Sequence, residues 1–145
     1  MAQVNKAPEK PSKSEIAADA RALTRRATKG ALATMHSESG YPYASLITLA
    51  TDADGTPVFL ISTLARHTAN LVQDPRASIL IDATGALADP LQGARVTLTG
   101  TAERTADESV RRRFLARHPE AAVYAGIKPD RIIVITMAIS GRSPG

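Results

Sequence analysis

VFLISTLARHTANLVQDPR, residues Val58–Arg76, is the stretch around which the rest of the chain can be understood. Its first four residues, Val58–Ile61, are apolar and mostly β-branched or aromatic, which favours a half-buried strand. The strand ends in two hydroxyl residues, Ser62 and Thr63, and apolar residues then recur at helical spacing. Because proline cannot continue a helix, the short helix that follows the strand must end before Pro75.

The junction between this strand and this helix predicts an anion-binding site. A helix start presents free N–H groups and a partial positive charge, and the hydroxyls of Ser62 and Thr63 can complete a phosphate cradle with Arg66. His67 adjoins this group in the sequence. An alternative stays open, in which the hydroxyls are ordinary helix caps and Arg66 and His67 are solvated surface residues.

The flanking sequence predicts antiparallel strands joined by short turns, such as those at Ser39-Gly40 and Asp54-Gly55. Such a set removes its exposed edges by closing into a barrel. The expected fold is therefore α+β and mainly β, an antiparallel barrel with flanking helices. Besides the short helix above, helices are expected over Ser14–Lys29, Asp107–Arg117 and Pro119–Tyr124, and six strands over Ala31–His36, Pro42–Thr51, Thr56–Ser62, Ala77–Asp82, Ala94–Arg104 and Arg131–Met137.

The length and composition predict one domain. A chain of 145 residues with 43% hydrophobic residues can bury a substantial core, and we place the domain at residues 14–140. Residues 1–13 are polar and contain two prolines, so they are expected to form a disordered basic tail. Residues 141–145 are expected to be a frayed tail.

The charge distribution argues against nucleic-acid binding. Residues 1–29 hold seven Lys/Arg and three Asp/Glu, and the rest of the chain holds eleven of each, so the net charge of +4 comes from the N-terminal part. A nucleic-acid binder normally shows a basic stripe across its folded body. No apolar segment reaches the roughly 18 residues of a membrane span, and the N-terminus lacks the apolar core of a secretory signal. These patterns predict a cytoplasmic protein that does not enter a membrane.

The residues that metals and nucleophiles require are sparse. Cysteine is absent, which excludes disulfides and thiolate sites. The three histidines, His36, His67 and His118, fit no zinc spacing, so no metal site is expected. His118 precedes a proline at a predicted helix end, where it would interact with the helix dipole, and His36 is expected at the surface. No serine lies in the sequence context of a nucleophile elbow.

An ordered series of short segments resembles the pyridoxamine 5′-phosphate oxidase-like, FMN-binding split-barrel superfamily. Within this superfamily the chain is most similar to the branch of haem-iron utilisation proteins. The resemblance covers about residues 18–126 and implies a six-stranded split barrel. The segments that carry it are Gly30–Thr34, Gly40–Leu46, Ser62–Asn70, Asp74–Ser78 and Arg95–Gly100.

This resemblance implies a homodimer with FMN at the interface between protomers. The phosphate would be held where the third predicted strand meets the short helix, and the flavin ring would lie along the second strand and beside the long later strand. The residues implied for the phosphate are Ser62, Thr63, Arg66 and His67, and those implied for the ring are Ala44, Ser45, Leu46, Ile47 and Arg95.

Three of these positions depart from the oxidase that gives the superfamily its name. The oxidase has Arg where this chain has Ala44, Lys where it has His67, and Gln where it has Arg95. Its C-terminal substrate-binding motif is also not evident, so oxidation of pyridoxamine phosphate itself is not expected. The resemblance implies a flavin-dependent oxidoreductase acting on an unknown small molecule. The alternative is a haem-binding or haem-iron utilisation protein without flavin turnover, in which any of the three histidines could bind the iron.

Overall fold

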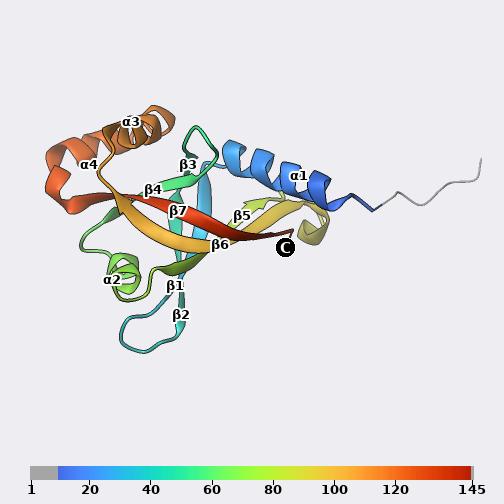
Figure 1. The fold of residues 1–145 in the computed structure, drawn as a ribbon, viewed down its shortest axis with the longest axis horizontal. Coiled ribbons are helices and arrows are strands. Elements are labelled where there is room, and N and C mark those ends of the chain that lie inside the picture. The colour runs from blue at the N-terminus through green and yellow to red at the C-terminus, as the bar shows by residue number, and fades with distance from the viewer. Residues whose placement is uncertain (1–9, 145) are drawn as a thin grey trace, which may run out of the picture.

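Residues 10–144, described by a computed structural model, form a curled antiparallel sheet with helices around it (Figure 1). The predicted tail, residues 1–13, falls mostly on residues 1–9, which lie outside the described part. Two single 3₁₀ turns occupy Pro90–Gln92 and Pro129–Arg131. The helices are α1 (Lys13–Arg26), α2 (Arg66–Gln73), α3 (Glu108–Arg117) and α4 (Ala121–Ile127), and the strands are β1 (Lys29–Met35), β2 (Pro42–Thr48), β3 (Ala50–Thr51), β4 (Pro57–Ser62), β5 (Arg76–Ala83), β6 (Ala94–Thr105) and β7 (Ile132–Ser143).

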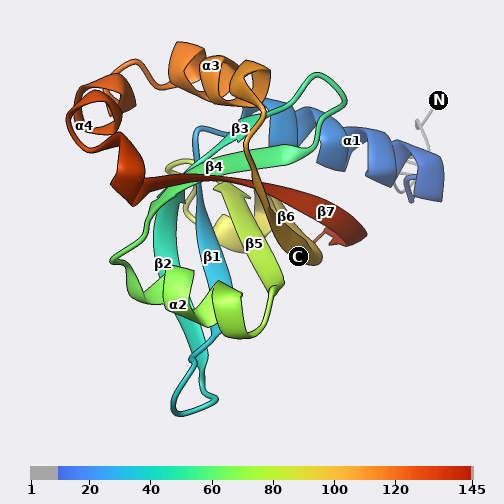
Figure 2. The same cartoon turned by 60° about the vertical axis from the view of Figure 1, so that its left-hand side comes forward.

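The strand order shows why the sheet curls. The order is β2-β1-β5-β6-β7-β4-β3, so β2 and β3 lie at its two ends. These two strands are consecutive in the chain and only Leu49 separates them, so the two ends of the sheet must come together (Figure 2). Leu49 is fully buried at this closure. The α+β antiparallel split-barrel fold is therefore confirmed, with seven strands within residues 10–144 instead of six because Pro42–Thr51 is broken at Leu49.

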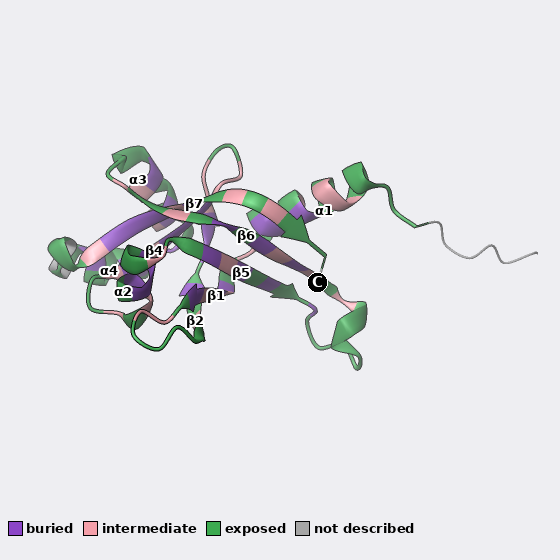
Figure 3. Ribbon diagram, turned by 60° about the horizontal axis from the view of Figure 1, so that its bottom comes forward, coloured by how far each residue is buried: buried purple, intermediate pink, exposed green. Residues whose placement is uncertain are grey.

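Aliphatic side chains fill the inside of the curl, as expected for a chain with 3% aromatic residues. Leu32, Ile79 and Leu98 from three neighbouring strands are fully buried, and their strand neighbours alternate to the outside (Figure 3). α1 covers one opening of this core with Ala20 and Leu23. A second, smaller cluster forms where α3 packs on β4 and β7 through residues that include Val58, Val110, Phe114 and Val134.

The C-terminal strand is longer than the sequence predicts. We expected it to end at Met137 and residues 141–145 to fray, but β7 continues to Ser143 and pairs Arg142 with Leu98. The reason is that β6 is 12 residues long and needs a partner along its first half. A bulge between Thr99 and Gly100 accommodates the change of register, and a Cβ at Gly100 would collide with the backbone of β7.

The described residues contain neither a membrane-spanning helix nor a group of side chains that could hold a metal ion. None of the helices in residues 10–144 is long and apolar enough to cross a membrane. Within the same residues, no three His, Cys, Asp or Glu side chains gather into a group that could hold a metal ion.

Candidate functional site

The start of α2 is a helix terminus with unpaired backbone donors. Its N-cap residue is Ala65, which has no side-chain acceptor. Among the described residues, the N–H groups of Arg66 and His67 have no hydrogen-bond partner. Ser62 does not cap the helix, since its hydroxyl accepts from the N–H of Leu64 at 3.1 Å. The ordinary-cap alternative therefore does not describe this helix start, which keeps its partial positive charge available to an anion.

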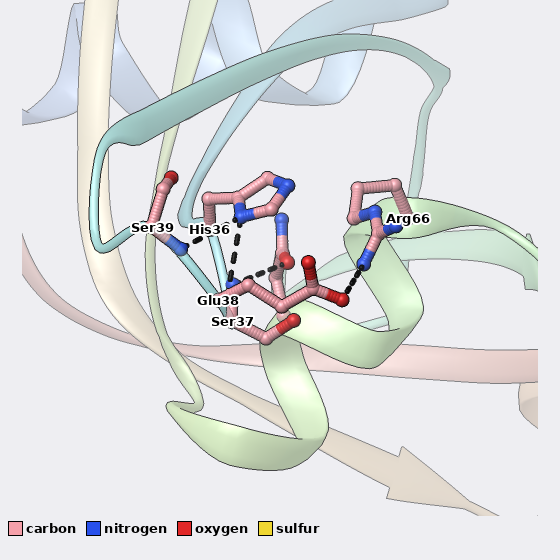
Figure 4. A network of polar contacts seen from close by, with 6 residues as sticks. His36, Ser37, Glu38, Ser39 and Arg66 are labelled. Carbon is pink, nitrogen blue, oxygen red and sulfur yellow. Dashed lines mark hydrogen bonds and ion pairs between the residues drawn. The ribbon is translucent and has the colours of Figure 1, made fainter.

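Arg66 lies beside these free N–H groups. Its side chain is 42% exposed, and its Nη1 donates to Oε1 of Glu38 at 3.5 Å (Figure 4). Glu38 comes from the turn between β1 and β2, 28 residues earlier in the chain. The guanidinium therefore faces solvent and already contacts one carboxylate.

His67 connects α2 to β2. Its Nδ1 lies 3.0 Å from the hydroxyl of Ser45, which brings together two of the predicted cofactor residues. Its Nε2 is buried and has no partner among the described residues. Burial lowers the pKa of His67, so the ring is neutral at neutral pH. A buried polar atom without a partner carries a free-energy cost, which a bound ligand could relieve.

β2 divides its predicted residues between two faces. Ser45 and Ile47 point toward the inside of the sheet, whereas Ala44 and Leu46 point outward, and Leu46 is 75% exposed. The outward face continues onto β1, where Ala31 pairs with Leu46 and Ala33 pairs with Ala44. The result is an outer face of β1 and β2 with small and apolar side chains.

Two open hollows lie on this outer face. One, of about 710 Å³, is near α2 and is lined by residues that include Met35, Arg76, Ser78 and Thr99. The other, of about 580 Å³, is at the far end and is lined by residues that include Lys29, Leu46, Leu80 and Asp82. A flat ring system needs an apolar wall with polar groups at its edge, and both hollows offer that combination.

Arg95 lies at the end of the sheet opposite α2. In the antiparallel pair β5–β6, Arg76 is opposite Thr101 near α2, whereas Asp82 is opposite Arg95 at the other end. The Nη1 of Arg95 donates to the carbonyls of Leu91 at 2.7 Å and Gly93 at 3.3 Å. The predicted cofactor residues therefore form two separate groups within one chain.

The other two histidines also use ring nitrogens in hydrogen bonds, one nitrogen in His36 and both in His118. The Nδ1 of His36 accepts from the N–H groups of Glu38 at 3.3 Å and Ser39 at 3.2 Å. His118 was expected to act at a helix end, and it is the C-cap of α3. However, its ring is buried and its Nε2 donates to the carbonyl of Leu49 at 2.8 Å, so it links α3 to the closure of the sheet.

Sequence reasoning missed two residues that build this site, Glu38 and Asn70. Asn70 is fully buried, and its Nδ2 donates to the hydroxyl of Thr34 at 3.0 Å. Its Oδ1 accepts from the N–H of Ser37 at 2.9 Å, so it fixes α2 against the β1–β2 connection. A signal for Asn70 was present, because a polar residue stands beside Leu71 on the apolar face of the helix.

Comparisons with known proteins agree on the fold and differ in the cofactors that they name. A family model described as "Pyridoxamine 5'-phosphate oxidase" matches residues 16–139. The "Non-canonical heme oxygenase HOZ, chloroplastic" of Arabidopsis thaliana is 40% identical over 87 residues, which are 57% of this chain and 26% of that protein. The chain thus spans about a quarter of the length of this curated relative.

The solved structures likewise agree on the fold and name different cofactors. A heme binding protein from Mycobacterium smegmatis is 36% identical, with a TM-score of 0.73 over 93% of this chain and 54% of the other. A FAD-binding protein from Mesorhizobium loti has a TM-score of 0.67 over 87% of this chain and 91% of the other. At 16% identity, this second likeness concerns the fold alone.

Proposed function

The chain belongs to the pyridoxamine 5′-phosphate oxidase family, and on that premise we propose that it binds FMN with the phosphate at the start of α2. The observation that carries this proposal is the combination of free N–H groups, the exposed guanidinium of Arg66 and the unpartnered Nε2 of His67 at one helix terminus. Phosphate oxygens are suitable acceptors for the backbone N–H groups and for Arg66, and the Nε2 of His67 would reach a ligand only if the ring turned outward. Ser62 and Thr63 border the same place.

The flavin ring would lie on the outer face of β1 and β2, against Ala44 and Leu46. Arg95 lies opposite Asp82, at the end of β5 that is remote from α2 and Arg66. We propose that both contact a single FMN, with two protomers facing each other and Arg95 supplied by the partner subunit. The proposal therefore includes a homodimer with FMN between the protomers, and the uncovered apolar face supports it.

Bound FMN would supply electron and hydride transfer, and the chain would supply binding and exclusion of water. Arg66 would hold the phosphate with a charge-assisted hydrogen bond. The ring of His67, kept neutral by burial and held by Ser45, would border the phosphate site without adding charge. The proposed activity is oxidoreduction of a small molecule other than pyridoxamine phosphate, because Ala44 stands where that oxidase has an arginine.

Haem binding is the second candidate. It is favoured by the names of two relatives, the heme oxygenase at 40% identity and the heme binding protein at 36% identity. The geometry supports it less, since an axial histidine needs an unprotonated ring nitrogen free to reach the iron. Both ring nitrogens of His118 are hydrogen-bonded, the Nδ1 of His36 accepts from two backbone N–H groups, and the free Nε2 of His67 is buried. His67 would have to turn outward to become the ligand.

Arg66→Ala tests the first candidate. Losing a charge-assisted contact of roughly 1.5–3 kcal/mol should weaken FMN binding about ten- to a hundredfold. Fluorescence titration with FMN measures this change. Arg112→Ala, which removes the same side chain from the exposed surface of α3, serves as the control and should bind FMN like the wild type.

The same protein should then be titrated with hemin. An FMN affinity that is unchanged in Arg66→Ala would contradict the phosphate site at α2. A wild-type protein that ignores FMN but gives a Soret band with hemin, and loses that band in His67→Ala, would establish the second candidate instead.

A further inference from the structure

We propose that Glu38 is a built-in competitor for the anion at Arg66: its carboxylate occupies the anion's place, and an anionic ligand binds by displacing it. This inference rests on the proposed function, since it concerns the same site at the start of α2. Figure 4 shows the Glu38 carboxylate turned toward Arg66 from the turn between β1 and β2.

The turn that carries Glu38 is held in position by its own contacts. The N–H of Ser37 donates to Oδ1 of the buried Asn70 on α2, at 2.9 Å. The Nδ1 of His36 accepts from the N–H groups of Glu38 and Ser39. Gly40, at a φ of 74°, provides the left-handed conformation with which the turn closes. The backbone of Glu38 is therefore fixed relative to α2 before any ligand arrives.

The Glu38 carboxylate changes the net charge that a ligand meets at this site. Arg66 contributes one positive charge and Glu38 removes it, so the two side chains sum to zero. His67, kept neutral by burial, adds no charge. A phosphate that approaches α2 meets a guanidinium already paired with an anion, and the carboxylate would repel it. Neutral or weakly charged ligands suffer no such repulsion, so Glu38 tunes which ligands the site accepts.

The pair is weak enough to be displaced. The Glu38 side chain is 77% exposed, and the contact to Arg66 is long, at 3.5 Å. Rotation of this side chain into solvent releases Arg66 without any change in the backbone of the turn. Glu38 thus competes with a ligand without closing the site.

Glu38→Gln tests the proposal, because it keeps the shape of the side chain and removes the charge. In the variant, the ligand no longer has to displace an exposed ion pair. We therefore expect the variant to bind FMN roughly two- to fivefold more tightly at low ionic strength. The gain should shrink at high salt, where exposed charges are screened. Glu108→Gln, at the exposed start of α3, is the matched control and should not change the affinity.

A double variant identifies the partner. If Glu38 acts by competing at Arg66, Glu38→Gln should no longer improve binding in the Arg66→Ala background. A gain that persists there would show a general charge effect and overturn the proposal. If Glu38→Gln and the wild type bound FMN equally tightly, the competitor proposal would also be wrong. If Arg66→Ala still bound FMN more weakly in that case, the FMN proposal would stand.

Inorganic pyrophosphate separates this proposal from the FMN proposal. Its binding is measured as thermal stabilisation at constant ionic strength. If no variant binds FMN but pyrophosphate stabilises Glu38→Gln more than the wild type, Glu38 is a competitor and the FMN proposal fails. If pyrophosphate stabilises both proteins equally, the competitor proposal is wrong.

Discussion

His67 illustrates at the scale of one residue how burial sets chemistry. The unfolded chain takes up a proton at His67 with the ordinary histidine pKa of 6.5, whereas burial lowers the pKa in the folded chain. The stability that the neutral ring contributes is therefore fully present above about pH 6.5 and is lost as the pH falls toward the lower folded value.

The corresponding prediction concerns His67→Gln. Between about pH 7.5 and about pH 5, the free energy of unfolding should fall more steeply for the wild type than for the variant, because only the wild type can protonate at this position when it unfolds. Urea denaturation at several pH values measures the two slopes. His36 and His118 are present in both proteins and cancel in the comparison. Asp74, whose pKa Arg76 lowers to about 2, titrates below this window. Parallel slopes would mean that His67 is not buried in solution.

Single residues also show where sequence reasoning stops. Arg66 and His67 could be selected in advance, because a strand that ends in hydroxyls before a helix is a recognisable pattern. The contacts of His67 with Ser45 and of Arg66 with Glu38 could not be predicted, because they join residues that are 22 and 28 positions apart in the chain. Such contacts depend on the placement of α2 over the first two strands, which no local pattern specifies.

At the scale of elements, α2 is tied to the sheet by one buried side chain. Replacing Asn70 by Ala leaves the N–H of Ser37 and the hydroxyl of Thr34 without their partner. We expect a loss of about 1–3 kcal/mol in the free energy of unfolding, together with faster hydrogen exchange in residues 36–41. Chemical denaturation and exchange by mass spectrometry measure these changes.

Val72→Ala is the control on the same helix. Its side chain is 83% exposed, so the stability should change by no more than about 0.5 kcal/mol. If Asn70→Ala were equally mild, Asn70 would not be what holds α2 in place.

The element boundaries were predictable where local signals are strong. The short helix was placed correctly because Pro75 ends it, and β4 because its apolar run ends in hydroxyls. The end of β7 was not predicted correctly, because Ser140, Gly141 and Ser143 are residue types that are typical of an unstructured tail. Their pairing with β6 is a tertiary effect that outweighs local propensity.

At the scale of the whole molecule, the uncovered outer face predicts self-association. Leu46 points outward from β2 on this face and is 75% exposed, so Leu46→Arg should shift a wild-type dimer toward monomer without unfolding it. Sedimentation or light scattering measures the mass, and circular dichroism checks the fold. Leu91→Arg changes a residue that is 70% exposed in the loop before β6 and should leave the mass unchanged. A monomeric wild type would contradict the expected homodimer.

The overall architecture could be derived from sequence only in part. The antiparallel connections and the resemblance were enough for the split barrel. The closure was not visible, because residues 42–51 look like one continuous strand and nothing marks Leu49 as the point where the chain passes between the two ends of the sheet. The position of β7 between β6 and β4 likewise depends on contacts distant in sequence.

The position of β7 also constrains the protein while it is being made. A ribosome synthesises the chain from its N-terminus, so β1 to β6 emerge before the strand that joins β6 to β4 exists. Until residues 132–143 have left the exit tunnel, β4 and β6 each carry an edge without a partner, and such edges are templates for aggregation. The sheet therefore stays open between β6 and β4 until β7 has emerged, and β7 then covers both edges in one step.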